Sequence, residues 1–352
     1  MRKGILCAGN MLVDITYPIE GWPAQGELVR VLPGIGRSTG GAVCNVIADL
    51  ARLDLSLPLF AAGIAGHDPE GDFILEQLSR YPNIDTSAVL RTGQTAFTLV
   101  MSNTADRQRT FFQYAGAMAE YGEQHLDVDQ LECAILHIGY LLLLPHLDAP
   151  DAEYGTRMAR LLHRVQSRGI KTSIDVVTAA DGAFAAVVPP ALKYTNYCTV
   201  NELEAQRITG VALRTADGTL LRQNMPAALQ RLREMGVAVW AVIHCPEAGF
   251  GMDENGVFCE CPSLCLPQGY IKGTVGAGDA FCAGVLYAAH SGLPLAQALQ
   301  LAVQAYGFTA FPYEFLVMLP YVLVVVVLVF VGKSKHVGPA MLGKPFNREM
   351  RT

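Results

Sequence analysis

The residues best suited to chemistry follow a short glycine-rich segment. Residues 273–281 read GTVGAGDAF and run into an apolar helical pattern, so Gly276, Ala277 and Gly278 directly precede Asp279. Small residues let the backbone approach a ligand closely, and amides at a helix N-terminus attract anions. A carboxylate there can take a proton from a hydroxyl that attacks a phosphate. Taken alone, the segment is explained more simply by an Asp that complements the helix dipole.

Two further segments place polar side chains at the starts of helices. Gly40 and Gly41 precede one helical pattern, with Asn45 one turn inside it. Asn201 and Glu204 follow a predicted strand and lie on one side of the helix that they open. Such a pair can hold a hydrated Mg²⁺, although taken alone it is more typical of a capping box.

Short apolar runs alternate with helical patterns up to about residue 304. Apolar strands are typical of a sheet buried on both faces, and their alternation with helices favours a mostly parallel sheet with helices on both sides. Polar–apolar alternation at residues 27–32 and 94–112 predicts strands with one solvated face, which can form a small lid. Strands are expected at residues 4–8, 57–62, 134–138, 172–177, 197–200 and 238–245, and helices at 42–53, 153–167, 226–235, 277–290 and 294–304.

The composition excludes several classes of protein. Hydrophobic residues make up 51% and charged residues 16% of the 352 residues, which excludes a disordered chain. A net charge of -6 offers no basic field for nucleic acid. The N-terminus lacks a signal-peptide pattern, so the nine cysteines are expected to be reduced in the cytoplasm. Cys259, Cys261 and Cys265 cluster without a fourth metal ligand nearby, which favours a Cys-rich strand and loop over a zinc site.

Together these motifs resemble the ribokinase-like (PfkB) family of carbohydrate kinases over residues 1–304. Residues 273–281 are similar to the family's D-T-x-G-A-G-D, residues 40–45 to G-G-x-x-x-N and residues 201–204 to N-x-x-E, in the family's order. The resemblance implies an α/β three-layer sandwich with a central, mostly parallel sheet. It also implies a β-sheet lid at about residues 15–38 and 94–115, and ATP-dependent phosphorylation of a sugar or nucleoside hydroxymethyl group.

The resemblance also implies roles for individual residues. Asp279 would be the catalytic base, and the turn before it would form an anion hole for the transferring phosphoryl group. Asp175, at a predicted strand end, would lie near the phosphates or simply cap its strand. Several family members bind a monovalent cation, so K⁺ is expected beside ATP and Mg²⁺. The implied anion-hole residues are Gly276, Ala277 and Gly278; the substrate-binding residues are Asp14, Asn10, Gly40, Gly41 and Asn45; the nucleotide-binding residues are Asn201, Glu204, Thr274, His244 and Gly249, of which Asn201 and Glu204 would hold the metal through water.

The sequence departs from the family pattern at four positions. Gly273 replaces the first Asp of the long motif. Pro246 replaces the first glycine of the nucleotide loop and removes an N–H group. His244 stands where the family usually has Thr or Lys, and it either contacts phosphate or packs at its strand end. Met118 stands where many members have Asn, which would change substrate contacts near the lid.

The largest departure begins at about residue 305. Residues 305–352 resemble the C-terminal end of a simple-sugar ABC transporter permease, so the chain reads as a chimera. Within them, residues 315–331 hold 16 hydrophobic residues and one proline. As a helix they would span about 25 Å of a roughly 30 Å hydrocarbon core, which permits membrane contact. A β-branched strand or a buried helix packed on the kinase domain is the alternative.

The leading prediction is a cytoplasmic carbohydrate kinase whose activity is weakened by the replaced C-terminus. The alternatives are a sugar- or nucleoside-binding pseudokinase and a membrane-attached fusion product. The expected partners are a small sugar or nucleoside and ATP, and the edge of the lid sheet can pair two copies into a homodimer. The sequence leaves the identity of the sugar open.

Overall fold

The computed structural model describes residues 3–106, 108–177, 184–267 and 276–308. The described residues belong to one compact unit, Met1–Ala310. The permease-like resemblance from residue 305, and membrane contact through residues 315–331, therefore stay predictions that lie almost wholly outside the described residues. Among the described residues, none of the helices is both long enough and apolar enough to cross a bilayer.

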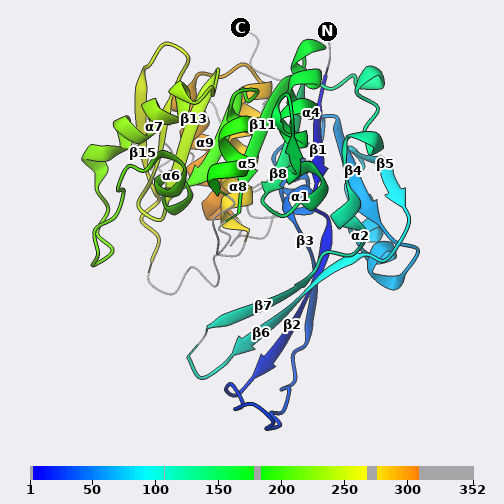
Figure 1. Ribbon diagram of the computed structural model, residues 1–352. Helices are drawn as coiled ribbons and strands as arrows, with labels where there is room; N and C mark the ends of the chain where they lie inside the picture. Colours follow the sequence, from blue (N-terminus) through cyan, green and yellow to red (C-terminus); the bar gives the residue numbers. More distant parts are fainter. Residues whose placement is uncertain (1–2, 107, 178–183, 268–275, 309–352) are drawn as a thin grey trace, which may run out of the picture. The chain divides into compact units, whose positions relative to one another are not determined.

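A nine-stranded sheet forms the centre of this unit (Figure 1). The strands from β13 to β5 in sheet order run parallel, while β14 and β15 continue the sheet antiparallel at one edge. In sheet order the strands are β15 (Phe258–Pro262), β14 (Ala248–Met252), β13 (Trp240–Cys245), β12 (Tyr197–Asn201), β11 (Lys171–Val176), β8 (Ile135–Leu141), β1 (Ile5–Gly9), β4 (Leu59–Ala65) and β5 (Ile84–Arg91).

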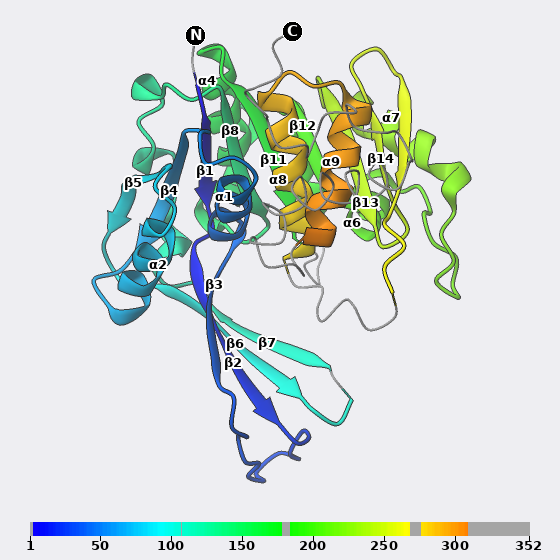
Figure 2. The same ribbon diagram turned by 180° about the vertical axis from the view of Figure 1, so that it is seen from behind.

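Helices cover both faces of this sheet, which confirms the predicted three-layer α/β sandwich. One face carries α1 (Ala42–Leu53), α2 (Pro69–Ser79), α8 (Ala277–His290) and α9 (Leu295–Phe308), as Figure 2 shows. The other carries α3 (Pro145–Asp148), α4 (Arg157–Ser167), α5 (Phe184–Leu192), α6 (Glu202–Thr209) and α7 (Met225–Glu234). Two hydrophobic clusters, one on each face, form the core.

One expected helix begins later than predicted, and some strands were missed. The helix expected at residues 153–167 begins at Arg157, because β9 (Pro150–Asp151) and β10 (Gly155–Thr156) form a hairpin before it. The Thr156 hydroxyl caps this helix by accepting a hydrogen bond from the Ala159 amide at 3.1 Å. Strands β5 and β14 were not predicted, whereas β15 includes Cys259 and Cys261, where a Cys-rich strand was favoured. Glycines, which are depleted in strands, obscure the pattern of β14.

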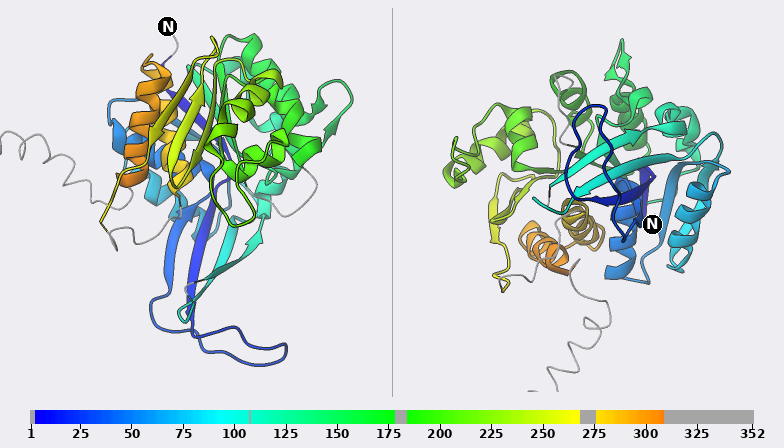
Figure 3. Two further views of the ribbon diagram at one scale, coloured as in Figure 1. Left: turned by 90° about the vertical axis from the view of Figure 1, so that its left-hand side faces the viewer. Right: turned by 90° about the horizontal axis from the view of Figure 1, so that it is seen from below.

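A second sheet of four strands provides the small sheet that was predicted as a lid. Its order is β3 (Gly36–Gly40), β2 (Leu12–Ile19), β6 (Ala96–Asn103) and β7 (Arg109–Tyr114). It projects from the carboxyl end of the central strands, and the view from below shows its strands crossing that end (Figure 3). The strand expected at residues 27–32 is absent. That segment makes only an isolated bridge between Ile19 and Val31.

Helices α8 and α9 approach each other closely at Gly284. A Cβ atom at this position would lie 2.6 Å from the Cα of Ala302. Because that neighbour is backbone, it cannot move aside without displacing its whole helix. The absence of a side chain at Gly284 therefore lets α8, which carries Asp279, pack closely against α9.

We expect Gly284→Val to lower the free energy of unfolding by about 1–3 kcal/mol, because the added side chain overpacks the contact between α8 and α9. Denaturant unfolding followed by circular dichroism measures the change. Ala289→Val, in the same helix at a half-buried position, is the control. Equal losses in the two variants would contradict the packing role of Gly284.

Candidate active site

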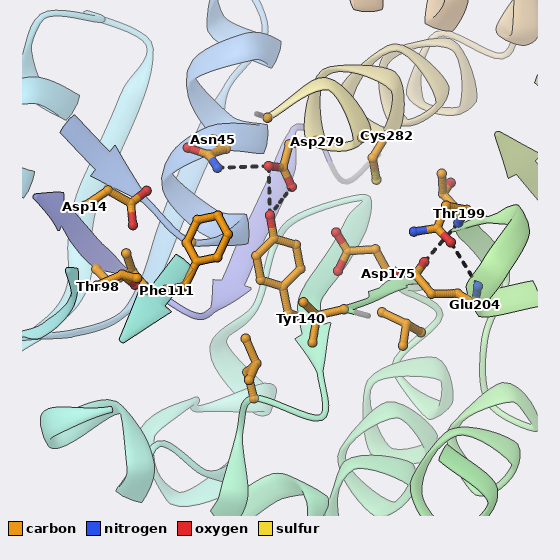
Figure 4. Close-up of a pocket in the computed structure, with 18 of the residues that line it drawn as sticks. Asp14, Asn45, Thr98, Phe111, Tyr140, Asp175, Thr199, Glu204, Asp279 and Cys282 are labelled. Atoms are coloured by element: carbon orange, nitrogen blue, oxygen red, sulfur yellow. Dashed lines mark hydrogen bonds between the residues drawn. The ribbon is translucent and has the colours of Figure 1, made fainter. Parts of the chain in front are cut away.

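One cavity of about 550 Å³ lies between the carboxyl ends of the central strands and the four-stranded sheet. Figure 4 shows side chains from β2, β6 and β7 on one side of it and from β12 and α6 on the other. Ligands of open α/β sheets bind at this edge. The predicted residues that line the cavity are Asp14, Gly41, Asn45, Asp175, Asn201, Glu204, His244, Gly276, Gly278 and Asp279.

Asp279 lies in the first turn of α8, with 5% of its surface exposed. The Asn45 amide donates to its Oδ2 at 2.8 Å, and the Tyr140 hydroxyl lies 2.7 and 2.8 Å from its two oxygens (Figure 4). Burial raises the pKa of Asp279, and these two hydrogen bonds oppose the rise. Burial, with Asp279 beside it, also raises the pKa of Tyr140 well above its usual value, so Tyr140 remains a donor.

The turn before Asp279 is shaped by small residues. Gly276 is the N-cap of α8 in the left-handed region, with φ of 75°, which favours glycine. A Cβ atom at position 278 would lie 3.3 Å from the His244 ring. Ala277 is buried beneath this turn and is not among the lining residues. Thr274 lies outside the described residues.

His244, at the end of β13, both packs and lines the cavity. Its ring stacks on Phe281, with ring centres 5.1 Å apart. Burial lowers the pKa of His244 to about 4. The imidazole is therefore neutral near pH 7, so it can give the cavity a hydrogen bond but no positive charge.

Asp14, on β2, faces the cavity from the lid. Its backbone partner on β6 is Thr98, whose hydroxyl also bonds its carboxylate. Burial raises the pKa of Asp14, the Thr98 hydroxyl opposes the rise, and nearby Asp279 adds to it. A Cβ atom at position 40 would lie 2.3 Å from Asp14 Oδ2. Gly40 does not line the cavity, but its lack of a side chain makes room for the Asp14 carboxylate.

Two residues expected in the site lie behind it. Asn10 is buried, and its carbonyl accepts a hydrogen bond from the Val43 amide at 3.2 Å. A Cβ atom at Gly41, where φ is 83°, would lie 2.4 Å from that carbonyl oxygen. Asn10 thus supports the turn that begins α1 and is not among the lining residues. Gly249 leaves room for Phe281 instead of lining the cavity, since its Cβ atom would lie 2.8 Å from that ring.

Asn201 and Glu204 form a capping box at the start of α6 and also line the cavity. The backbone N–H of Glu204 donates to Asn201 Oδ1 at 2.9 Å, and the backbone N–H of Asn201 donates to Glu204 Oε2 at 2.9 Å. The structure confirms the capping box, and the metal-holding role of the same pair stays a prediction. The capping geometry holds a carboxylate and an amide oxygen at the cavity wall, which are the oxygen donors that Mg²⁺ prefers.

Several lining residues were missed from the sequence. Thr199 belongs to a predicted strand and Tyr140 follows one, just beyond its expected end at residue 138, so the rule that ligands bind at strand carboxyl ends could have identified them. Thr98, Phe111 and Gln113 come from the lid and Cys282 from the second turn of α8, where the sequence carries no comparable signal. Met118, expected near the substrate, is buried in the core and is not among the lining residues.

Asp175, at the end of β11, carries a buried carboxylate close to other acids. Its Oδ1 has no hydrogen-bond partner. Burial raises its pKa well above 3.8, and the nearby carboxylates of Asp279 and Glu204 add to the rise. An acid whose pKa is higher in the folded than in the unfolded state lowers the free energy of unfolding as the pH rises above its pKa in the unfolded state.

We therefore expect Asp175→Asn to raise the free energy of unfolding, and to do so more at pH 8 than at pH 5. Urea unfolding at the two pH values measures the difference. Glu132→Gln, the same chemical change at an exposed position, serves as the control. An equal effect of Asp175→Asn at both pH values would contradict the raised pKa.

Comparisons with known proteins place this chain in one family. The chain matches the pfkB family of carbohydrate kinases over residues 2–309. It is 24% identical over 305 residues to a ribokinase of Arabidopsis thaliana, covering 86% of this chain and 74% of that protein. The structure of Arabidopsis thaliana ribokinase complexed with ribose and ATP is similar, with a TM-score of 0.71 and 20% sequence identity. The match covers 88% of this chain and 92% of that one. The structure of a ribokinase of Thermotoga maritima is also similar, with a TM-score of 0.70 and 17% sequence identity, over 88% of this chain and 93% of that one. The chain belongs to the pfkB family of carbohydrate kinases.

Proposed function

We propose that this chain transfers the terminal phosphoryl group of ATP to a hydroxymethyl group of a sugar or nucleoside, with Asp279 as the general base. The observation that carries the proposal is the position of Asp279. It lies buried at a helix N-terminus, with polar lid residues on one side of it and the Asn201–Glu204 pair on the other. Membership of the family supports a carbohydrate as the acceptor. The similar Arabidopsis ribokinase structure contains ribose and ATP, which supports ATP as the donor.

The proton transfer follows from the hydrogen bonds of Asp279. A substrate hydroxyl that reaches this carboxylate takes the place of the Tyr140 or the Asn45 donor. The hydroxyl proton passes to Asp279 while the oxygen attacks the γ-phosphorus and the bond to the ADP oxygen breaks. Burial raises the pKa of Asp279, which makes the carboxylate a stronger base than an exposed aspartate.

The start of α8 would stabilise the negative charge on the transferring phosphoryl group. Backbone amides around Gly276, Ala277 and Gly278, with the positive end of the helix dipole, would stabilise its oxygens. The residues that would hold Mg²⁺, through water, are Asn201 and Glu204, and their oxygen donors fit this hard cation. When bound, Mg²⁺ would neutralise charge on the phosphates. K⁺ binding stays a prediction.

The lid side of the cavity would hold the sugar. Asp14, Thr98 and Asn45 offer acceptors and donors for hydroxyl groups, and Phe111 and Gln113 lie at the same wall. A cover over the sugar excludes water, which would otherwise compete as the acceptor. Dimerisation through the lid, a cytoplasmic location and weakened activity due to the C-terminal segment stay predictions.

We expect Asp279→Asn to lower the turnover number by about 10²–10⁴-fold, because the amide cannot accept the substrate proton. An assay of ADP release over a panel of sugars and nucleosides measures it, and calorimetry checks that sugar binding persists. Asp49→Asn is the control. Its carboxylate also has a raised pKa, of about 6, but lies outside the cavity. Undiminished turnover in Asp279→Asn would refute the assignment of the base, and binding of sugar without any ADP release by the unmodified chain would support a pseudokinase.

A second prediction concerns the hydrogen bond from Tyr140. Because this bond lowers the pKa of Asp279, Tyr140→Phe should raise that pKa. The base must be deprotonated to act, so the acidic limb of the kcat/KM profile should move to higher pH. Tyr121→Phe, at a buried tyrosine outside the cavity, should leave the limb in place. An unmoved limb in Tyr140→Phe would contradict the role of this hydrogen bond.

A further inference from the structure

Beside the cavity, three buried side chains from different elements bring a nitrogen, an oxygen and a sulfur atom together. His137 on β8, Asp175 on β11 and Cys282 on α8 are 0%, 7% and 1% exposed. One potential ligand atom from each lies within 4.8 Å of the other two. Among the described residues, this is the cluster of His, Cys, Asp or Glu side chains whose geometry suits a metal ion.

Two atoms of the cluster lack hydrogen-bond partners. They are His137 Nε2 and Asp175 Oδ1, both buried. Buried polar atoms are normally paired, so these two atoms of one cluster are open to a ligand that would pair them. His137 Nδ1 lies 3.1 Å from Ser173 Oγ. If Nδ1–H donates to that hydroxyl, Nε2 presents a lone pair to the cluster, which is how metal-binding histidines are usually held.

The spacing needs little adjustment to hold an ion. Zinc bonds of about 2.0–2.3 Å in a tetrahedron place ligand atoms roughly 3.3–3.6 Å apart. His137 Nε2 lies 3.8 Å from Asp175 Oδ2. Gly139 leaves room for the Asp175 carboxylate, since a Cβ atom there would come 2.4 Å from its Oδ1. The three ligand atoms lie within 4.8 Å of one another, so each pair would have to approach by at most about 1.5 Å to close around one cation.

The charges also balance for a divalent ion. A carboxylate, a thiolate and a neutral imidazole carry two negative charges, which a dication neutralises completely. Without an ion, burial raises the pKa values of Asp175 and Cys282 well above their usual values and lowers that of His137 to about 3. Sulfur and imidazole ligands select Zn²⁺ over Mg²⁺, which prefers oxygen. This site is thus chemically distinct from the Asn201–Glu204 pair.

We propose that His137, Asp175 and Cys282 form a binding site for one Zn²⁺ ion at the floor of the cavity. Three protein ligands leave the fourth tetrahedral position open. Asp175 and Cys282 both line the cavity, so the open position faces it (Figure 4). A water molecule or an oxygen atom of a cavity ligand would fill it. The proposal rests on the geometry of the cluster and does not depend on the proposed kinase activity.

The test uses the full chain with Co²⁺ and Zn²⁺ as probes, in the presence of excess Mg²⁺. Cobalt bound by a thiolate absorbs in the near ultraviolet through sulfur-to-metal charge transfer, so this band reports a cysteine ligand. We expect one Co²⁺ per chain, the charge-transfer band, and displacement of Co²⁺ by Zn²⁺. Cys282→Ser, nearly equal in volume, should abolish the band and weaken Zn²⁺ binding by at least about tenfold.

Two control variants separate this site from other cysteines. Cys198→Ala changes an equally buried cysteine on the opposite face of the sheet and should keep the band and the affinity. Replacing Cys259, Cys261 and Cys265 together by Ser should also keep both. Zn²⁺ should raise the melting temperature of these controls and not that of Cys282→Ser.

Three outcomes would overturn the proposal. They are absence of the charge-transfer band in the unmodified chain, an unchanged band and affinity in Cys282→Ser, and loss of both in the triple Ser variant. If Cys282→Ser does not fold, as judged by circular dichroism, Cys282→Ala and His137→Gln supply the same comparison. Zn²⁺ affinity that is unchanged in both of these would overturn the proposal equally.

Discussion

The burial of one carboxylate at a helix N-terminus is the constraint on which the rest of the site depends. Asp279 loses its water on entering the core, and donors from two other elements, Asn45 on α1 and Tyr140 on β8, replace it. A buried charge without such partners would be costly. The hydrogen bonds therefore fix three elements relative to one another. Any shift of α1 or of the end of β8 would leave the carboxylate unsatisfied.

Glycines permit the close approaches that this arrangement requires. Gly40 makes room for the Asp14 carboxylate, Gly41 for the Asn10 carbonyl and Gly284 for the backbone of α9. At each of these positions a Cβ atom would lie under 3 Å from a backbone or carboxylate atom. The motif glycines before α1 are thus needed for packing as much as for ligand contact. The glycines in the sequence therefore mark positions where the fold around the site leaves no room for a side chain.

The site also brings together several aspartates whose negative charges repel. Burial raises the pKa values of Asp14, Asp175 and Asp279, and repulsion from Asp279 adds to the rise at Asp14 and Asp175. Such a cluster destabilises the fold at neutral pH, and perturbed groups of this kind gather where ligands or ions bind. A proton donor and cations at the cavity would each relieve this repulsion. The Zn²⁺ site inferred at Asp175 and the Mg²⁺ site proposed at Glu204 would both relieve this repulsion.

The sequence by itself determined the layer architecture, the small second sheet, helices α1 and α8 to the residue, and the motif positions of Asp279, Asn45, Asn201 and Glu204. These features are local, because they depend on apolar periodicity and on glycine and cap residues a few positions apart. Only the tertiary structure decided that Tyr140 bonds Asp279, that Asn10 and Gly249 lie behind the cavity, and that His137, Asp175 and Cys282 meet. The last three come from separate elements 38 and 107 residues apart along the chain. Their meeting depends on strand order and on which face each side chain takes, and both are set when the sheet and its helices pack together.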